Sequence, residues 1–173
     1  MRFRDHISAF MLPLAALILI PMILLLVARD ARISWEISST CNSILLLTGA
    51  FLLLIGVWLM VVTIKMFYQL GKGTLAPWAP TQNLVMTGIY LRTRNPMISG
   101  VISVIIGEGL IFSSWAILLW GLIFLIGNHF YFIFSEEPRL HKRFGEEYLL
   151  YKENVPRWIP RLSPWNPNHK SVE

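Results

Sequence analysis

Four long apolar stretches alternate with segments that are rich in charge, glycine or proline. They cover residues 7–27, 44–64, 97–112 and 115–134. A transmembrane helix needs about 20 mostly apolar residues, and a helix satisfies the backbone polar groups that lipid leaves without partners. The pattern therefore predicts an all-α integral membrane protein with about four transmembrane helices.

The last two apolar stretches are separated only by Ser113 and Ser114. So short a connection predicts a tight helical hairpin, in which the third helix begins and the fourth helix ends at the same membrane face. The third stretch is short for a complete span unless its Pro96 end lies within protein rather than lipid.

Beyond the fourth stretch, apolar residues recur at helical spacing. They stand at positions i, i+4, i+8 and i+11: Leu140, Phe144, Tyr148 and Tyr151. This spacing is typical of one apolar helix face, Pro138 suits a first helical turn, and Pro156 ends the pattern. The tail is therefore predicted to form a cytoplasmic amphipathic C-terminal helix.

The composition agrees with a membrane protein. The chain is 55% hydrophobic and 14% charged, whereas soluble domains are about 25% charged. A net charge of +5 also suits a nucleic-acid-binding protein, but in a membrane protein excess Lys and Arg usually set the topology. We therefore expect no nucleic acid partner. The single cysteine, Cys41, excludes an intramolecular disulfide and a Cys-based metal site.

Basic residues without neighbouring acids lie between the second and third stretches, at Lys65, Lys72, Arg92 and Arg94. The positive-inside rule places this segment and both termini in the cytoplasm, and the compact four-span form favours a bacterial inner membrane. We divide the chain into residues 1–70, with two N-terminal transmembrane helices, and residues 71–173. The second part holds the loop 71–96, whose length is typical of functional loops, the hairpin and the tail.

Charged pairs flank the predicted hairpin. Arg92 and Arg94 precede the third stretch, and Glu136 and Glu137 end the fourth. The tight turn brings the two pairs to one membrane face, where carboxylates could hold a cation and guanidinium groups an anion. Ordinary salt bridges that anchor the helices at the interface are the alternative.

The Asn95-Pro96 pair predicts where the third helix begins. Proline removes a backbone donor and moves Asn95 out of helical conformation, so free N–H groups should face the charged pairs. Gly100, one turn further, permits close approach by another backbone or a ligand. Gly88 and Tyr90 lie upstream in the same loop.

An acid and a histidine lie inside the apolar stretches. Glu108 is either a structural acid, bonded to a neighbouring helix or kept neutral, or part of a site, since unpaired charge at membrane depth is costly. His129, on the partner helix of the hairpin, could reach it. No second histidine lies close enough in sequence to predict a metal site.

Residues 71–165 resemble the isoprenylcysteine carboxyl methyltransferase family and, more loosely, the phospholipid methyltransferases. The resemblance is carried by "GKGTLAPWAPTQNLVMTGIYLRTRNPMISG", a short hairpin and "EEPRLHKRFGEEYLLYKENVPRWIP". It implies methyl transfer from S-adenosyl-L-methionine (the cofactor) to a lipophilic small molecule or lipidated substrate in the membrane. A carboxylate acceptor, as in isoprenylcysteine O-methylation, is one candidate.

The resemblance also implies roles for single residues. Arg94 and Glu137 take the catalytic positions, and a carboxylate of the Glu pair holds the amino end of the cofactor. Among the expected cofactor-binding residues, Asn95, Pro96, Glu136 and Glu137 are carried over from the family. Their places in the loop and the helices add Gly88, Tyr90, Gly100 and His129, with Arg92 and Glu108 as weaker pocket candidates. The chain departs from the family at Asn95, where histidine is usual, and at Ile98, where tyrosine is common.

Two other classes remain open. A membrane reductase of the steroid-reductase type would have a similar hairpin and tail and would bind a nicotinamide cofactor. A non-enzymatic small membrane protein is the third reading, but an inert scaffold has no need to concentrate opposite charges at one membrane face.

Overall fold

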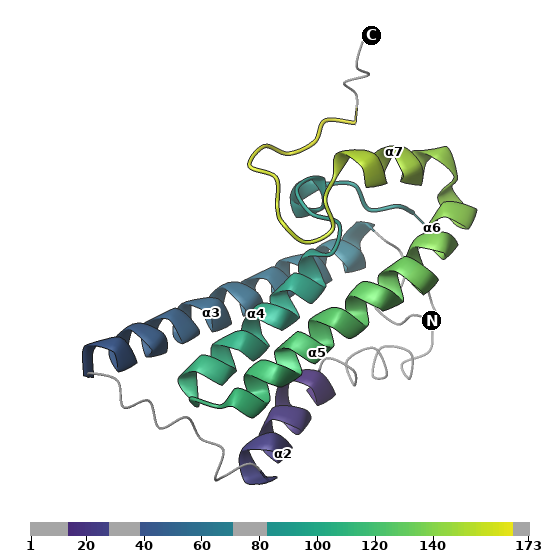
Figure 1. Cartoon of the computed structure of the whole chain (residues 1–173). Coiled ribbons are helices and arrows are strands. Elements are labelled where there is room, and N and C mark those ends of the chain that lie inside the picture. The colour runs from purple at the N-terminus through teal and green to yellow at the C-terminus, as the bar shows by residue number, and fades with distance from the viewer. Residues whose placement is uncertain (1–13, 28–38, 71–82, 168–173) are drawn as a thin grey trace.

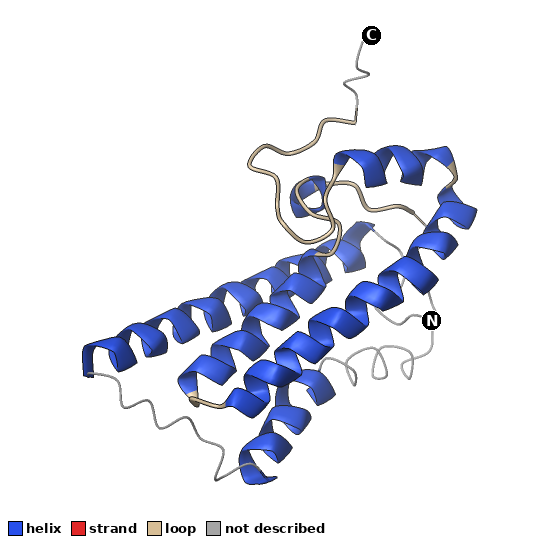
Figure 2. Cartoon of the chain, viewed as in Figure 1, coloured by secondary structure: helices blue, strands red, loops and turns tan. Residues whose placement is uncertain are grey.

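Every regular element in the described residues is a helix. The computed structural model describes residues 14–27, 39–70 and 83–167, and within these ranges it contains helices and loops without a strand (Figure 2). The all-α prediction is confirmed for this part of the chain. In order, the elements are η1 (Ala15–Leu19), α2 (Ile20–Val27), α3 (Ser39–Leu70), η3 (Gly88–Leu91), α4 (Pro96–Ile111), α5 (Trp115–Tyr131), η4 (Phe132–Glu136), α6 (Glu137–Phe144) and α7 (Glu146–Asn154).

Helices α3 and α4 lie side by side because glycines face each other across their contact (Figure 1). A Cβ atom added to Gly100 would lie 2.8 Å from the carbonyl oxygen of Gly56, and one added to Gly107 would lie 2.7 Å from that of Gly49. Small residues let two backbones approach, which is how helices associate where lipid removes the hydrophobic drive.

The chain reverses between α4 and α5 within residues 112–114 (Figure 1). Ser113 adopts a positive φ of 49°, and the Ser114 backbone N–H donates to the Gly109 carbonyl at 2.9 Å. The Ser114 hydroxyl then accepts from the Ile117 backbone N–H at 3.4 Å, as an N-cap does. Both ends of this connection lie within one residue of the predicted positions.

A small apolar core joins these helices to the N-terminal one. Val101, Ile105 and Ile117 are buried, and partly buried residues pack against them: Leu17, Leu24, Leu25, Met60, Trp120 and Phe124. The Trp120 Nε1–H also donates to the Ala16 carbonyl at 3.0 Å. The core therefore ties η1 and α2 to α5.

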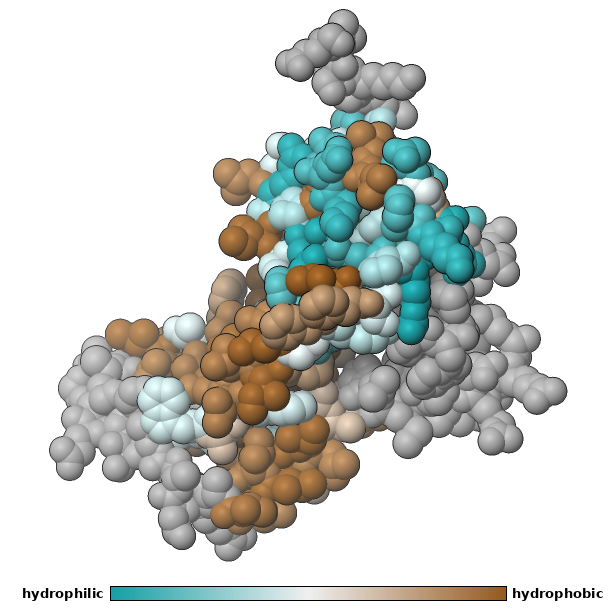
Figure 3. Space-filling model, turned by 45° about the vertical axis from the view of Figure 1, so that its right-hand side comes forward, coloured by the Kyte–Doolittle hydropathy of each residue, from teal (hydrophilic) through white to brown (hydrophobic). Residues whose placement is uncertain are grey.

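The outer faces of the long helices are apolar and exposed, as in lipid-facing surfaces. Two helices are long and apolar enough to cross a membrane, Asn42–Met66 and Trp115–Phe144, while α4 and Ala15–Val27 are shorter. Figure 3 shows hydrophobic residues over the lower part of the molecule and hydrophilic residues gathered at its upper end. Two of the four predicted spans thus meet the length criterion; the count of four stays a prediction, and residues 7–13 of the first lie outside the described ranges.

The prediction of one continuous C-terminal helix is wrong, because the structure has two helices there, α6 and α7. Helix α5 continues through η4 into α6, and Gly145, with φ of 55°, separates α6 from α7. A left-handed glycine ends a helix readily, and the apolar spacing did not reveal it. The four apolar residues of the predicted face nevertheless share one cluster with Val155: Leu140, Phe144, Tyr148 and Tyr151.

Candidate active site

The segment 155–165, which we call the C-terminal strap, lies along the loop before α4. The Arg94 backbone N–H donates to the Pro156 carbonyl, that of Arg161 to Arg92, and that of Trp165 to Leu91, each at 2.9 Å. These bonds pair two segments that are far apart in sequence, and they bring the strap over the start of α4.

Side chains strengthen this pairing. The Thr93 hydroxyl donates to the Arg157 carbonyl at 3.0 Å. One guanidinium nitrogen of Arg92 donates to the Arg161 carbonyl at 3.1 Å and also to that of Leu162. Arg92 was predicted as a weaker pocket residue, and the structure places its guanidinium on the strap.

Tyr90 and Gly88 lie in η3, the short helix that precedes Arg92 in the same loop. Tyr90 is buried, its carbonyl accepts the Tyr151 hydroxyl at 2.7 Å, and burial, Tyr151 and Glu136 raise the pKa of its phenol. Gly88 has φ of 56°, and a Cβ atom there would meet Met66 at 2.9 Å. Both residues therefore shape the loop that carries Arg94. The preceding residues 71–82 lie outside the described ranges.

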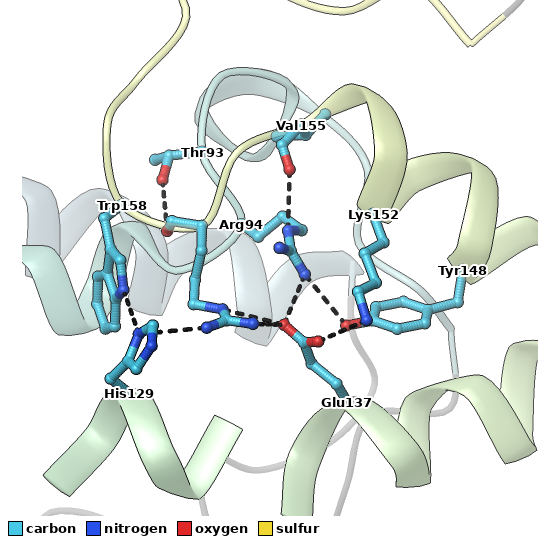
Figure 4. Close-up of polar contacts among 9 residues, drawn as sticks. Thr93, Arg94, His129, Glu137, Tyr148, Lys152, Val155 and Trp158 are labelled. Atoms are coloured by element: carbon cyan, nitrogen blue, oxygen red, sulfur yellow. Dashed lines mark hydrogen bonds and ion pairs between the residues drawn. The ribbon is translucent and has the colours of Figure 1, made fainter. Parts of the chain in front are cut away.

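Glu137 is the centre of a polar cluster at this end of the molecule (Figure 4). Its Oε1 atom accepts from Arg94 Nη1 at 2.8 Å and also from the Arg157 guanidinium, while its Oε2 atom pairs with Lys152 Nζ at 2.8 Å. We call these four residues the carboxylate cluster. Arg94, Glu137, Lys152 and Arg157 come from the loop, α6, α7 and the strap respectively.

The members of the carboxylate cluster differ in burial. The exposed fraction is 9% for the side chain of Glu137, 11% for Arg94 and 14% for Arg157, but 43% for Lys152. A buried charge needs a partner, and here three cations surround one carboxylate. The cluster therefore holds surplus positive charge that can attract an anion.

Arg94 is fixed by further bonds. Its Nε–H donates to the Val155 carbonyl at 2.9 Å, and Nη1 lies 3.3 Å from the Tyr148 hydroxyl. Burial, with the negative charge of Glu137, raises the pKa of Tyr148 to about 12. Tyr148 is thus a neutral phenol beside the guanidinium, and Arg94 is oriented before any ligand binds.

His129 extends the carboxylate cluster along α5. Its Nδ1 atom lies 3.2 Å from Arg157 Nη1 and 3.2 Å from Trp158 Nε1 (Figure 4). Arginine and tryptophan nitrogens can only donate, so Nδ1 accepts both bonds and the ring proton lies on Nε2. His129 can therefore offer a ligand one N–H donor, from Nε2.

Glu108 does not lie in this cluster. It stands twelve residues after Pro96 on α4, roughly 18 Å along the helix, and its Oε2 atom is buried with no hydrogen-bond partner in the described residues. The predicted contact between Glu108 and His129 is wrong, because antiparallel α4 and α5 hold these residues toward opposite ends of the pair.

The remaining candidates lie around the start of α4. Pro96 is its buried first residue, and Asn95 precedes it as N-cap without a capping bond from its side chain. Gly100 packs against α3, so helix packing accounts for this glycine. Glu136 is half-buried at the end of η4, next to Glu137.

Several members of the site were missed from the sequence: Thr93, Tyr148, Lys152, Arg157 and Trp158. Arg157 and Trp158 stand in the quoted segment "VPRWIP", so a basic residue between two prolines was an available signal. Lys152 lies on a helix rich in charge, where nothing in the sequence distinguishes it from Lys142.

A comparison with known protein families identifies a match. A family model described as phospholipid methyltransferase matches residues 44–147, more than half of the chain. The match includes Arg94 and Glu137, and it ends before Lys152 and the C-terminal strap. No curated protein matches the chain.

Proposed function

We propose, because the chain belongs to the phospholipid methyltransferase family, that it uses S-adenosyl-L-methionine to methylate a lipophilic acceptor within the membrane. Family membership and the two apolar helices make the chain an integral membrane methyltransferase. The methyl donor, the acceptor and the residues that hold them are the proposal.

The observation that carries the proposal is the carboxylate cluster around the buried Glu137. The amino-acid end of the cofactor is a zwitterion, with an ammonium group and a carboxylate. Glu137 suits the ammonium, and the surplus charge of Arg94 and Arg157 suits the carboxylate. The donor set of this chain therefore fits the group, and the Nε2–H of His129 adds a donor beside it.

When bound, the cofactor supplies a methyl group already activated by a positively charged sulfur. The task of the protein is to hold that group in line with the acceptor and to exclude water. With Arg157 on the cofactor carboxylate, Arg94, which Val155 and Tyr148 orient, could hold an anionic acceptor. A carboxylate acceptor then needs no base, whereas an amine or hydroxyl acceptor must also lose a proton.

The proposed arrangement in the membrane follows from the distribution of polarity. The hydrophilic end of the molecule (Figure 3) would face the cytoplasm of a bacterial inner membrane, as the basic residues before α4 favour. A water-soluble cofactor would enter from that side. A lipophilic acceptor would enter between the helices from the bilayer.

Calorimetry with the purified protein in detergent tests the proposal. We expect wild type to bind S-adenosyl-L-methionine, and Glu137→Gln to lose at least tenfold in affinity because the ammonium loses its counter-charge. Glu153→Gln, which changes an exposed carboxylate on α7, is the matched control and should bind as wild type does.

Failure of folded wild type to bind the cofactor would overturn the proposal. Binding of a nicotinamide cofactor in its place would support the reductase reading. A thermal unfolding curve for each variant separates loss of affinity from loss of fold.

A further inference from the structure

We propose that Lys152 competes with the cofactor for Glu137, so that its ammonium group and the α-ammonium of S-adenosyl-L-methionine take turns at the same carboxylate oxygen. This inference rests on the proposed function. It makes Lys152 a residue that sets cofactor affinity, and it starts from the unequal partners of the two Glu137 oxygens.

The two oxygens of Glu137 have different partners. Oε1 accepts from both Arg94 and Arg157, whereas Oε2 pairs with Lys152 alone among the described residues. In Figure 4, Lys152 approaches the carboxylate from α7, on the side of Tyr148 and opposite His129. A ligand cation that binds Glu137 must therefore displace one of these partners or share an oxygen with it.

The guanidinium groups are poor candidates for displacement. Arg94 is also bound to the Val155 carbonyl at 2.9 Å, and Arg157 is bound to His129 at 3.2 Å. Both side chains are nearly buried, so moving either one would leave several bonds unmade. A ligand cation would therefore lose more free energy by displacing a guanidinium group at Oε1 than by displacing Lys152 at Oε2.

Lys152 has none of these constraints. Its side chain is 43% exposed, and within the described part of the chain its ammonium pairs with Glu137 alone. A lysine side chain is flexible and its ammonium is strongly hydrated, so it can move into water at little cost. The exposure of Lys152 also marks Oε2 as the solvent side of the carboxylate, where a water-soluble ligand would arrive.

The exchange conserves charge at the buried carboxylate. One ammonium group leaves Oε2 and another takes its place, so Glu137 keeps the same number of cationic partners throughout. A partly exposed ion pair is weak, so the competition is mild. Removing it should tighten cofactor binding by about two- to fivefold, which corresponds to the usual strength of such a pair.

Binding of three related ligands to Lys152→Met tests this directly. S-adenosyl-L-methionine has both an ammonium and a carboxylate, its decarboxylated analogue keeps only the ammonium, and 5′-methylthioadenosine has neither. We expect Lys152→Met to tighten the first two by about two- to fivefold and to leave the third unchanged. Lys142→Met, an exposed lysine on α6, should change none of them.

Lys152→Arg gives a second measurement in the opposite direction. A guanidinium group can bind a carboxylate through two hydrogen bonds and should hold Oε2 more firmly, so both ammonium ligands should bind more weakly than to wild type. Unchanged affinities in both Lys152 variants would overturn the inference.

The three ligands also distinguish competition from direct binding of the cofactor by Lys152. If Lys152→Met weakens S-adenosyl-L-methionine but not its decarboxylated analogue, Lys152 binds the ligand carboxylate and the inference is wrong. If wild type binds none of the three ligands, the proposed function itself fails and this inference falls with it.

Discussion

Two regions of this molecule are held together by different forces. In the helix bundle, formed by η1 and α2 to α5, glycines let backbones approach and a few buried aliphatic residues fill the core. In the polar cap, residues 83–95 and 137–167, an apolar cluster around Tyr148, Tyr151 and Val155 is joined by ion pairs at Glu137 and by hydrogen bonds between the loop and the strap.

This difference suggests that the bundle mainly determines the stability of the fold, whereas the cap mainly determines ligand binding. Packing in the bundle depends on volume, because lipid is as apolar as the protein interior and leaves close packing to hold the helices together. The cap depends on charge balance around Glu137, which ligands can alter. We therefore expect changes in the cap to affect binding and local order while leaving the bundle folded.

The largest expected effect comes from Arg157→Met. It leaves the buried Glu137 with fewer counter-charges and removes a donor from His129. Removing one partner of a buried ion pair costs about 3–5 kcal/mol. Hydrogen exchange should become faster in the cap and stay unchanged in α3. Arg139→Met, an exposed site on α6, is the control, and equal loss of protection in α3 would break the comparison.

A smaller effect is expected from Gly100→Ala in the bundle. The new methyl group would lie 2.8 Å from the Gly56 carbonyl oxygen, and overpacking of this kind costs about 1–3 kcal/mol. The melting temperature in detergent should fall. Gly127→Ala is the matched control, since beyond its chain neighbours and the backbone of its own helix turn no described atom lies within 4 Å of its new Cβ. A normal melting temperature for Gly100→Ala would show that α3 and α4 can separate freely.

The smallest effect is expected from Tyr151→Phe. It removes one hydrogen bond, from the tyrosine hydroxyl to the buried Tyr90 carbonyl at 2.7 Å, at a cost of about 0.5–1.5 kcal/mol. Local exchange in η3 should increase, with cofactor affinity nearly unchanged. A loss of affinity as large as that of Glu137→Gln would mean that the loop conformation, rather than the charges, controls binding.

The bundle was the more predictable region. Apolar length and the Asn95-Pro96 and Ser113-Ser114 signals predicted both ends of α4 and the beginning of α5 within one residue. The same reasoning brought Arg94 to Glu137, because a short connection forces the open ends of two helices together.

The cap was harder to predict because the residues that make its contacts do not recur at regular spacing along the sequence. An extended strap pairs through backbone groups that every residue possesses, so its register cannot be read from side-chain spacing. The break at Gly145 interrupts a helix whose apolar spacing continues across it. The error over Glu108 and His129 came from assigning a partner by helix proximity without considering how far each residue stands from the turn.

The strap also imposes an order on biosynthesis. Arg157 is made twenty residues after Glu137, so while the chain grows at about 5–20 residues per second, the long apolar helices are complete before this carboxylate can acquire all its counter-charges. The bundle can therefore enter the membrane before the site exists. A nascent chain of this protein has no complete carboxylate cluster until its strap has been synthesised and has paired with the loop.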